Sequence, residues 1–99
     1  MISIVILNWN GVELLKKCIP SVIKAIYTYG NNTEIIVVDN GSSDQSVGYL
    51  KSNFPQITII ALKENLGFAA GMNIGIREAK FSIVIGLNND IIAEEDFIA

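Results

Sequence analysis

Residues 34–44 read EIIVVDNGSSD, an apolar β-branched run that ends at Asp39 and passes directly into turn-forming residues. Similar runs occur three more times, as ISIVIL at 2–7, ITIIAL at 57–62 and FSIVIGL at 81–87. The four runs are nearly continuous in apolar character rather than alternating, which is typical of strands buried on both faces of a parallel sheet. The pattern therefore predicts four such strands.

The segments between these runs have helical periodicity. Apolar residues recur at three- and four-residue steps within residues 12–26, 47–54 and 68–79. Pro20 interrupts the first of these stripes and predicts either a kink or two consecutive short helices. Strands that alternate with helices indicate an α/β fold, with a Rossmann-like, mainly parallel sheet flanked by helices. In such sheets ligands bind at the carboxyl ends of the strands.

Composition excludes several classes of site. The chain of 99 residues has a net charge of −3 and only seven Lys and Arg, so we expect no binding to nucleic acid through phosphate contacts. It has no histidine, and Cys18 is its only cysteine. This excludes intramolecular disulfides, Cys/His zinc sites and nucleophilic chemistry of the Ser-His or Cys-His kind within the chain. Cys18 lies in an apolar pattern, and we expect a packed thiol.

The sequence also bears on the cellular compartment. No apolar run approaches the roughly 20 residues that cross a bilayer. The opening stretch MISIVILNWN lacks the basic segment and the cleavage site of a signal peptide. We expect a cytoplasmic protein, and peripheral association with the inner face of the cell membrane stays open.

Four polar loops follow the four predicted strands. They read NWNG at 8–11, DNGSSD at 39–44, KENLGF at 63–68 and NND at 88–90. Turn formation explains each loop taken singly. Because the carboxyl ends of parallel strands meet at one edge of the sheet, four polar loops there indicate a ligand site.

The second loop carries a carboxylate where a strand ends. Asp39 can accept hydrogen bonds there from a ribose hydroxyl or a base N–H. Gly41 allows a tight turn, and we expect Ser42 or Ser43 to cap the helix that follows. We expect Asp44 in the first turn of that helix, where a negative charge is favourable.

The third loop leads into a stretch with small residues at four-residue steps, Gly67, Gly71 and Gly75. This spacing is neither G-x-G-x-x-G nor a P-loop with its Lys. We expect the small residues to let a helix pack closely against the sheet or against a diphosphate. Asn73 is unfavourable in a helix by propensity, which favours a binding role for it.

In the fourth loop Asp90 is the only carboxylate. Mg²⁺ or Mn²⁺ bound to a nucleotide diphosphate needs only one or two protein carboxylates, because phosphate and water oxygens complete the coordination. Asp90 is therefore a candidate metal ligand. The alternative is a turn that leads into the acidic stretch AEEDF at 93–97.

In this order and at these spacings, the loops resemble the N-terminal half of family 2 glycosyltransferases, which are inverting enzymes of GT-A fold that use nucleotide sugars. EIIVVDNGSSD resembles the family signature D-(D/N)-G-S-x-D, and NLGFAAGMNIGI resembles N-x-G-x-(A/G)-x-x-x-N-x-G. ISIVILNWNG resembles the opening strand and turn, and LNND stands where D-x-D belongs. The resemblance covers nearly the whole chain. It implies that residues 1–99 are the nucleotide-sugar-binding part of a truncated catalytic domain, without the acceptor-binding half.

The resemblance implies a role for each matched position. Asp39 would contact the base or ribose, residues 8–10 would wrap the base, and Asn73 with the preceding glycines would lie beside the sugar diphosphate. Asn88 replaces the first Asp of D-x-D, and its amide keeps an acceptor oxygen but loses the charge. The implied nucleotide-sugar site comprises Asn8, Trp9, Asn10, Asp39, Asn65, Gly67, Gly71, Asn73, Asn88 and Asn89, with Mg²⁺ or Mn²⁺ at Asp90.

The resemblance also implies substrates. The donor would be a UDP-, dTDP- or GDP-sugar, and the acceptor a glycan or a lipid-linked hydroxyl in polysaccharide or cell-wall synthesis. The NND variant resembles rhamnosyltransferases and related polysaccharide transferases. Inverting transfer needs a carboxylate base that deprotonates the acceptor hydroxyl. Glu94, Glu95 and Asp96 are too near Asp90 to match it, so we expect the base beyond Ala99 and nucleotide binding without turnover.

Two other functions remain open from the residues alone. A sugar nucleotidyltransferase would share the sheet and the metal, but it would need a Gly-rich, Arg-containing loop after the first strand, and NWNGVELL at 8–15 has none. A non-catalytic α/β interaction module would use the polar loops only as turns. Whatever the function, a truncated sheet would leave an apolar edge or face that favours self-association.

Overall fold

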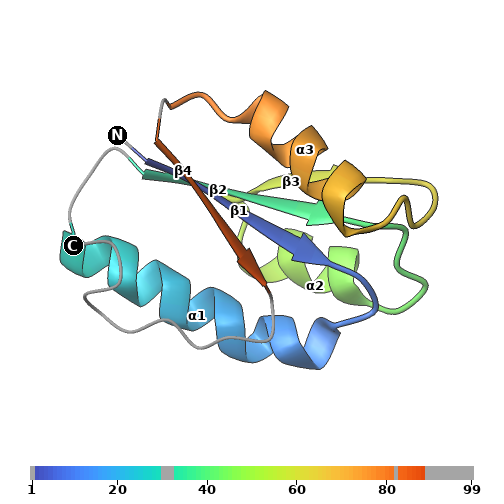
Figure 1. Cartoon of the computed structure of the whole chain (residues 1–99). Coiled ribbons are helices and arrows are strands. Elements are labelled where there is room, and N and C mark those ends of the chain that lie inside the picture. Colours follow the sequence, from blue (N-terminus) through green and yellow to red (C-terminus); the bar gives the residue numbers. More distant parts are fainter. Residues whose placement is uncertain (1, 30–32, 82, 89–99) are drawn as a thin grey trace.

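The computed structural model describes residues 2–29, 33–81 and 83–88. Within them strands alternate with helices, as the periodicity predicts (Figure 1). The α/β, Rossmann-like prediction is confirmed. The elements are β1 (Ile2–Asn8), α1 (Val12–Tyr29), β2 (Thr33–Asp39), α2 (Ser46–Asn53), β3 (Thr58–Ala61), α3 (Phe68–Glu78) and β4 (Ile83–Asn88).

The sheet formed by the described residues has the strand order β3-β2-β1-β4, and its pairings are parallel. The chain starts in the middle of the sheet, moves outward through β2 and β3, and then crosses to the other side of β1 to form β4. In this register Asn8 lies opposite Asp39, and Leu7 lies opposite Asn88. The carboxyl ends of β1, β2 and β4 therefore meet at the edge where the strand order reverses.

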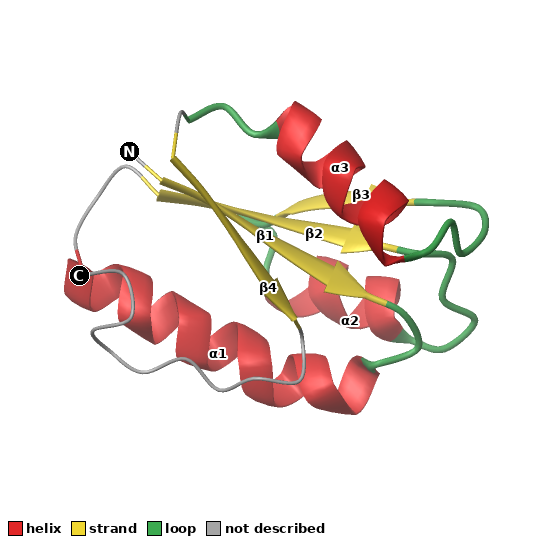
Figure 2. Cartoon of the chain, viewed as in Figure 1, coloured by secondary structure: helices red, strands yellow, loops and turns green. Residues whose placement is uncertain are grey.

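Helices cover both faces of the sheet. In Figure 2, α1 and α2 lie on one face and α3 on the other. β1 is buried along its whole length, with Ile4 and Ile6 in the apolar cluster of α1 and α2, and Val5 and Leu7 in the cluster of α3. Because successive side chains of a strand point to opposite faces, this two-sided burial explains the continuous apolar run.

The two outer strands depart from the prediction of burial on both faces. In β3, Thr58 and Ala61 are exposed, and in β4 the Ile83 side chain is 55% exposed. A strand at the edge of the sheet lacks a neighbour on one side, so the helices shield it less completely. The prediction is right for β1 and for most of β2, and wrong for β3 and β4. Self-association through an apolar edge stays a prediction.

The first helix is continuous through Pro20, so the prediction of two short helices is wrong. Pro20 is exposed, whereas Leu15, Ile19 and Val22 on the same helix are fully buried. Burial of this apolar stripe favours the helix in spite of the hydrogen bond that Pro cannot donate. The Cys18 side chain is also fully buried, which confirms the packed thiol. None of the described helices combines the length and apolar character that a membrane span requires.

At the amino edge of the sheet a carboxylate ties β4 to the central strands. Glu34 Oε2 accepts a hydrogen bond from the Ser3 hydroxyl at 2.6 Å and another from the Lys80 backbone N–H at 2.6 Å. The Phe81 N–H donates to Ser3 Oγ at 3.2 Å. These contacts position the connection between α3 and β4 and so set where β4 enters the sheet.

Two glycines let α3 pack closely on the sheet. A Cβ at Gly75 would clash with Val5 Cγ1 and lie 2.8 Å from Val38 Cγ2. A Cβ at Gly71 would lie 2.7 Å from Leu7 Cδ1. These distances are shorter than ordinary van der Waals contact, so the sheet leaves no room for a side chain at either position. The expectation of close helix–sheet packing is confirmed for Gly71 and Gly75, whereas a Cβ at Gly67 would meet nothing within 4 Å.

We predict that Gly75→Ala lowers the free energy of unfolding by about 1–3 kcal/mol, because overpacking costs more than the gain in helix propensity. Gly48→Ala in α2 is the matched control, since a Cβ there meets nothing within 4 Å. The control should raise stability by about 0.5–1 kcal/mol. Urea denaturation measures both, and equal effects of the two substitutions would contradict this account of α3.

Candidate functional site

Asp39 ends β2, and its side chain is only 2% exposed. Its Oδ1 accepts hydrogen bonds from Asn8 Nδ2 at 2.9 Å and from the Ser42 hydroxyl at 2.7 Å. Its Oδ2 accepts the Ser42 backbone N–H at 2.9 Å. A buried carboxylate needs such partners to offset its lost hydration. The strand register and these bonds together hold the Asp39 carboxylate in one orientation. It lies at the edge of the sheet where the parallel strands end, which we call the carboxyl edge.

Ser42 joins this carboxylate to the loop after β1. Its Oγ accepts the Asn10 backbone N–H at 2.8 Å and contacts Asn8 Nδ2 at 3.3 Å. The prediction that Ser42 or Ser43 caps α2 is wrong. The helix begins only at Ser46, its N-cap residue is Gln45, and neither serine side chain accepts an N–H of its first turn. The hydroxyl of Ser42 instead links the carboxyl ends of two neighbouring strands.

Asn10 fastens the same two loops from the other side. Its backbone has a φ of 48°, in the left-handed region that Asn tolerates better than most residues. Its Oδ1 accepts the backbone N–H of Ser43 at 2.7 Å and that of Asp44 at 3.2 Å. The loop after β1 is thereby docked onto the loop after β2.

Asp44 binds the N-termini of two helices at once. Its Oδ1 accepts the Ser46 N–H at 2.9 Å and the Ser46 hydroxyl at 2.5 Å, at the start of α2. Its Oδ2 accepts the N–H of Val12, the first residue of α1, at 3.2 Å. Asp44 therefore precedes α2 rather than lying in its first turn, but it does satisfy N–H groups at helix starts, as expected of an acid there.

The pKa of Asp44 reflects these bonds. Desolvation by burial raises the pKa of the Asp44 carboxyl. The hydrogen bonds from Ser46 and Val12 lower it, and together they outweigh the desolvation, so the pKa lies below its ordinary value. Because the folded pKa is depressed, ionised Asp44 contributes stability above the unfolded pKa of about 3.9. That contribution is lost as the pH falls through the folded pKa. At neutral pH the carboxylate is ionised and its contacts are formed.

The loop after β3 is attached through Asn40, whose side chain is only 2% exposed. Asn40 Oδ1 accepts the Leu66 N–H at 2.9 Å, and its Nδ2 donates to the Gly67 carbonyl at 3.0 Å. Gly41 has a φ of 80°, and a Cβ on it would lie 2.6 Å from the backbone of Glu64. The loops after β2 and β3 therefore pack backbone to backbone. Sequence reasoning missed Asn40, although it occupies the second position of the resembling signature.

The structure brings part of the predicted site together. Asn8, Asn10 and Asp39 form one hydrogen-bonded network, with Trp9 between the first two and 55% exposed. Asn65 is exposed, and its Oδ1 accepts the Gly67 N–H. These residues stay predictions for the nucleotide-sugar site.

The remaining predicted residues are placed less fully. Gly71 packs against the sheet, and Asn73 is exposed on α3. The backbone of Asn88 ends β4 beside Leu7. Outside the described residues lie Asn89, Asp90, Glu94, Glu95 and Asp96.

Among the residues that the structure describes, no three Asp, Glu or Cys side chains gather into a metal site. Asp39 and Asp44 stand at the carboxyl edge, but their oxygens accept protein hydrogen bonds. The predicted metal ligand Asp90 lies outside the described residues and stays a prediction.

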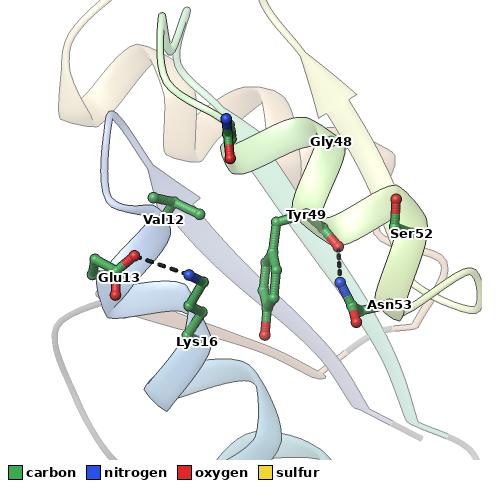
Figure 3. Close-up of a pocket in the computed structure, with 8 residues that line it drawn as sticks. Val12, Glu13, Lys16, Gly48, Tyr49, Ser52 and Asn53 are labelled. Atoms are coloured by element: carbon green, nitrogen blue, oxygen red, sulfur yellow. Dashed lines mark hydrogen bonds and ion pairs between the residues drawn. The ribbon is translucent and has the colours of Figure 1, made fainter.

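A surface hollow of about 410 Å³ lies between α1 and α2 (Figure 3). Lys16 Nζ lies there 3.0 Å from Glu13 Oε2 and 5.9 Å from the centre of the Tyr49 ring. The ion pair is exposed and contributes little to stability. None of the predicted nucleotide residues lines the hollow, which is formed by Val12, Glu13, Lys16, Gln45, Gly48, Tyr49, Ser52 and Asn53.

Comparison with known proteins identifies the family. The model for glycosyl transferase family 2 matches residues 3–99, and the chain belongs to this family. Glycosyltransferase GlyG of Streptococcus pneumoniae serotype 4 is 33% identical over 99% of this chain and 33% of its own length. The uncharacterized glycosyltransferase YfnE of Bacillus subtilis is 41% identical over 67% of this chain and 17% of its own. This chain thus spans at most about a third of the curated relatives named here.

Solved structures agree with the fold. The crystal structure of Staphylococcus aureus TarS 1-349 in complex with UDP-GlcNAc has a TM-score of 0.78 at 19% identity, over 90% of this chain and 26% of that one. The mannosyltransferase PcManGT of Pyrobaculum calidifontis, in complex with GDP-Man and Mn²⁺, has a TM-score of 0.75 at 21% identity, over 90% of this chain and 27% of that one. The GT-A prediction is confirmed, and family membership favours a glycosyltransferase over a sugar nucleotidyltransferase.

We predict that Asn40→Ala destabilises the chain by about 1–3 kcal/mol, because it leaves the Leu66 N–H and the Gly67 carbonyl without their partners. Amide hydrogen exchange at Leu66 should become faster than in the parent chain. The control is Asn65→Ala, at an exposed position next to Leu66. It should leave the Leu66 amide protected against hydrogen exchange. Unchanged exchange at Leu66 in Asn40→Ala would contradict the role given to this side chain.

Proposed function

We propose that this chain is the nucleotide-sugar-binding part of an inverting glycosyltransferase, which transfers a sugar from a nucleotide diphosphate to an acceptor hydroxyl. The observation that carries the proposal is the Asp39 carboxylate, which Asn8 and Ser42 hold at the carboxyl end of β2, beside the strand β1 from which the strand order reverses. A fixed acceptor at this edge can bind a ribose hydroxyl or a base N–H without reorganising on binding.

The loop after β1 supplies the second part of the donor site. Trp9 is a large aromatic side chain that is 55% exposed beside this network, although such side chains are usually buried. Stacking of a base on an aromatic ring contributes about 1–3 kcal/mol. We assign Trp9, between Asn8 and Asn10, to the surface against which the base lies.

For the diphosphate we propose Mg²⁺ or Mn²⁺ held by Asp90, with Asn88 as a neutral hydrogen-bonding partner of the donor. When bound, such a metal neutralises charge on the diphosphate leaving group. The GDP-Man and Mn²⁺ complex of PcManGT supports a divalent metal in this fold. Asn65, Gly67, Asn73 and Asn89 are assigned to the side of the site that faces the sugar diphosphate, and Gly71 supports this side by letting α3 pack against the sheet.

We propose a donor among UDP-, dTDP- and GDP-sugars, with rhamnosyl transfer as the specific case that Asn88 favours. The acceptor is a glycan or a lipid-linked hydroxyl at the cytoplasmic face of the cell membrane. A relative that is 30% identical over 96% of this chain, the poly-beta-1,6-N-acetyl-D-glucosamine synthase of Staphylococcus aureus strain COL, supports a role in polysaccharide synthesis. This chain covers 23% of that relative.

We predict that UDP, dTDP or GDP binds saturably to this chain by isothermal titration calorimetry, without sugar transfer. Asp39→Ala should weaken metal-free binding about 10- to 100-fold, because a hydrogen bond to a charged group contributes about 1.5–3 kcal/mol. Glu13→Ala, which removes an exposed acid in the hollow, is the control and should bind like the parent chain. The absence of saturable binding to all three nucleotides by the folded chain would overturn the proposed function.

A separate experiment tests the metal ligand. Asp90→Ala should abolish the increase in affinity that Mn²⁺ produces, while metal-free binding stays unchanged. Asp96→Ala removes another acid of the same segment and should keep the metal dependence. Equal metal dependence in the parent chain and in Asp90→Ala would refute the assignment to Asp90.

A further inference from the structure

The loop that carries Trp9 is anchored at both of its ends. At its start, the Asn8 side chain is bonded to Asp39. At its exit, the Val12 N–H donates to Asp44 Oδ2 at 3.2 Å, across 32 positions of sequence. Only three residues separate β1 from α1, and the bonds of Asn10 to Ser42 and Ser43 lie between these two anchors.

The exit anchor cannot be supplied by the loop itself. The first N–H groups of a helix have no partner within the helix, and a side chain just before the helix usually accepts one of them. Here that position is Gly11, which has no side chain. Asp44, in the loop after β2, instead accepts the Val12 N–H at the start of α1 through Oδ2. Its Oδ1 accepts the Ser46 N–H at the start of α2.

The contact between the loops is reciprocal. The Asp44 backbone N–H donates to Asn10 Oδ1 at 3.2 Å, and the Asp44 carboxylate accepts from Val12 two residues further on. Asn10 itself has a φ of 48°, a conformation that is uncommon outside glycine. Loss of the Asp44 carboxylate would remove the bond at the exit of the loop, and leave the bonds of Asn8 and Asn10 in place.

We propose that Asp44 is a positioning residue of the donor site: its carboxylate holds the loop of Trp9 and Asn10 in the geometry that binds the nucleotide base. This proposal rests on the proposed function. Asp44 does not touch the base in this account. It acts through the backbone of the loop, and it couples the placement of that loop to the start of α2.

The test compares Asp44→Ala with Asp44→Asn and Glu13→Ala. The Asn side chain keeps one acceptor oxygen, so it should partly restore the contact with one of the two helices. Glu13 is also an acid at the start of α1, and its removal controls for charge near that helix end. Far-UV circular dichroism and thermal unfolding establish that each variant is folded.

The first readout is Trp9, the only tryptophan of the chain. Time-resolved fluorescence anisotropy should show a larger, faster local motion of Trp9 in Asp44→Ala, an intermediate motion in Asp44→Asn, and no change in Glu13→Ala. The second readout is the affinity for UDP, dTDP and GDP without metal. It should fall about 3- to 10-fold in Asp44→Ala, recover in part in Asp44→Asn, and stay unchanged in Glu13→Ala.

The outcomes separate this proposal from the proposed function. If the folded parent chain binds none of the nucleotides, the proposed function fails, and the link between Asp44 and the donor site fails with it, even where Trp9 becomes more mobile. If the parent chain binds a nucleotide but the Asp44→Ala variant keeps both its affinity and its Trp9 motion, the positioning role alone is overturned. Increased motion of Trp9 with unchanged affinity would also overturn it.

Discussion

The structure depends on one buried carboxylate at the end of one strand. Parallel pairing in register sets Asn8 opposite Asp39, and the amide of the first then donates to the carboxylate of the second. Ser42 completes the arrangement with a backbone and a side-chain bond. Burying a charge is costly unless hydrogen bonds replace its hydration, so the turn after β2 must adopt a conformation that supplies them. The same requirement that stabilises the turn also fixes an acceptor oxygen at the edge where ligands bind in this class of fold.

Three side chains connect the loops at this edge of the sheet by hydrogen bonds. Asn10 and Asp44 dock the loop after β1 onto the loop after β2, and Asn40 docks the loop after β3 onto the same segment. Each of these side chains binds backbone groups, which satisfies N–H and C=O groups that would otherwise need water. The glycines of α3 serve a related purpose, because they bring the helix close enough for Gly71 to pack against Asn40. The loops are thus arranged by polar contacts above an apolar sheet.

Much of this architecture could be predicted from the sequence, because continuous apolar runs and helical stripes report burial directly. The exposure of the edge strands could not be predicted in this way. Ile83 has the sequence pattern of a core residue, and only the strand order shows that it lies at the edge of the sheet. The helix break predicted at Pro20 is absent because the packing of the rest of α1 outweighs one missing hydrogen bond. At the site, turn chemistry singled out Asp39 but assigned Ser42 to the wrong partner. Asn40 and the double contact of Asp44 depend on residues distant in sequence, which local patterns do not reveal.

The central claim is that the nucleotide lies on the network around Asp39. The most direct measurement is the change in backbone amide chemical shifts when UDP, dTDP or GDP is added to the ¹⁵N-labelled chain. We expect the largest changes in the loops of the carboxyl edge, at Trp9, Asn10, Ser42, Leu66 and Gly67. Amides of the hollow between α1 and α2, at Gly48 and Ser52, should not move. Changes concentrated in that hollow, with the carboxyl-edge amides unaffected, would contradict the placement of the nucleotide on the Asp39 network.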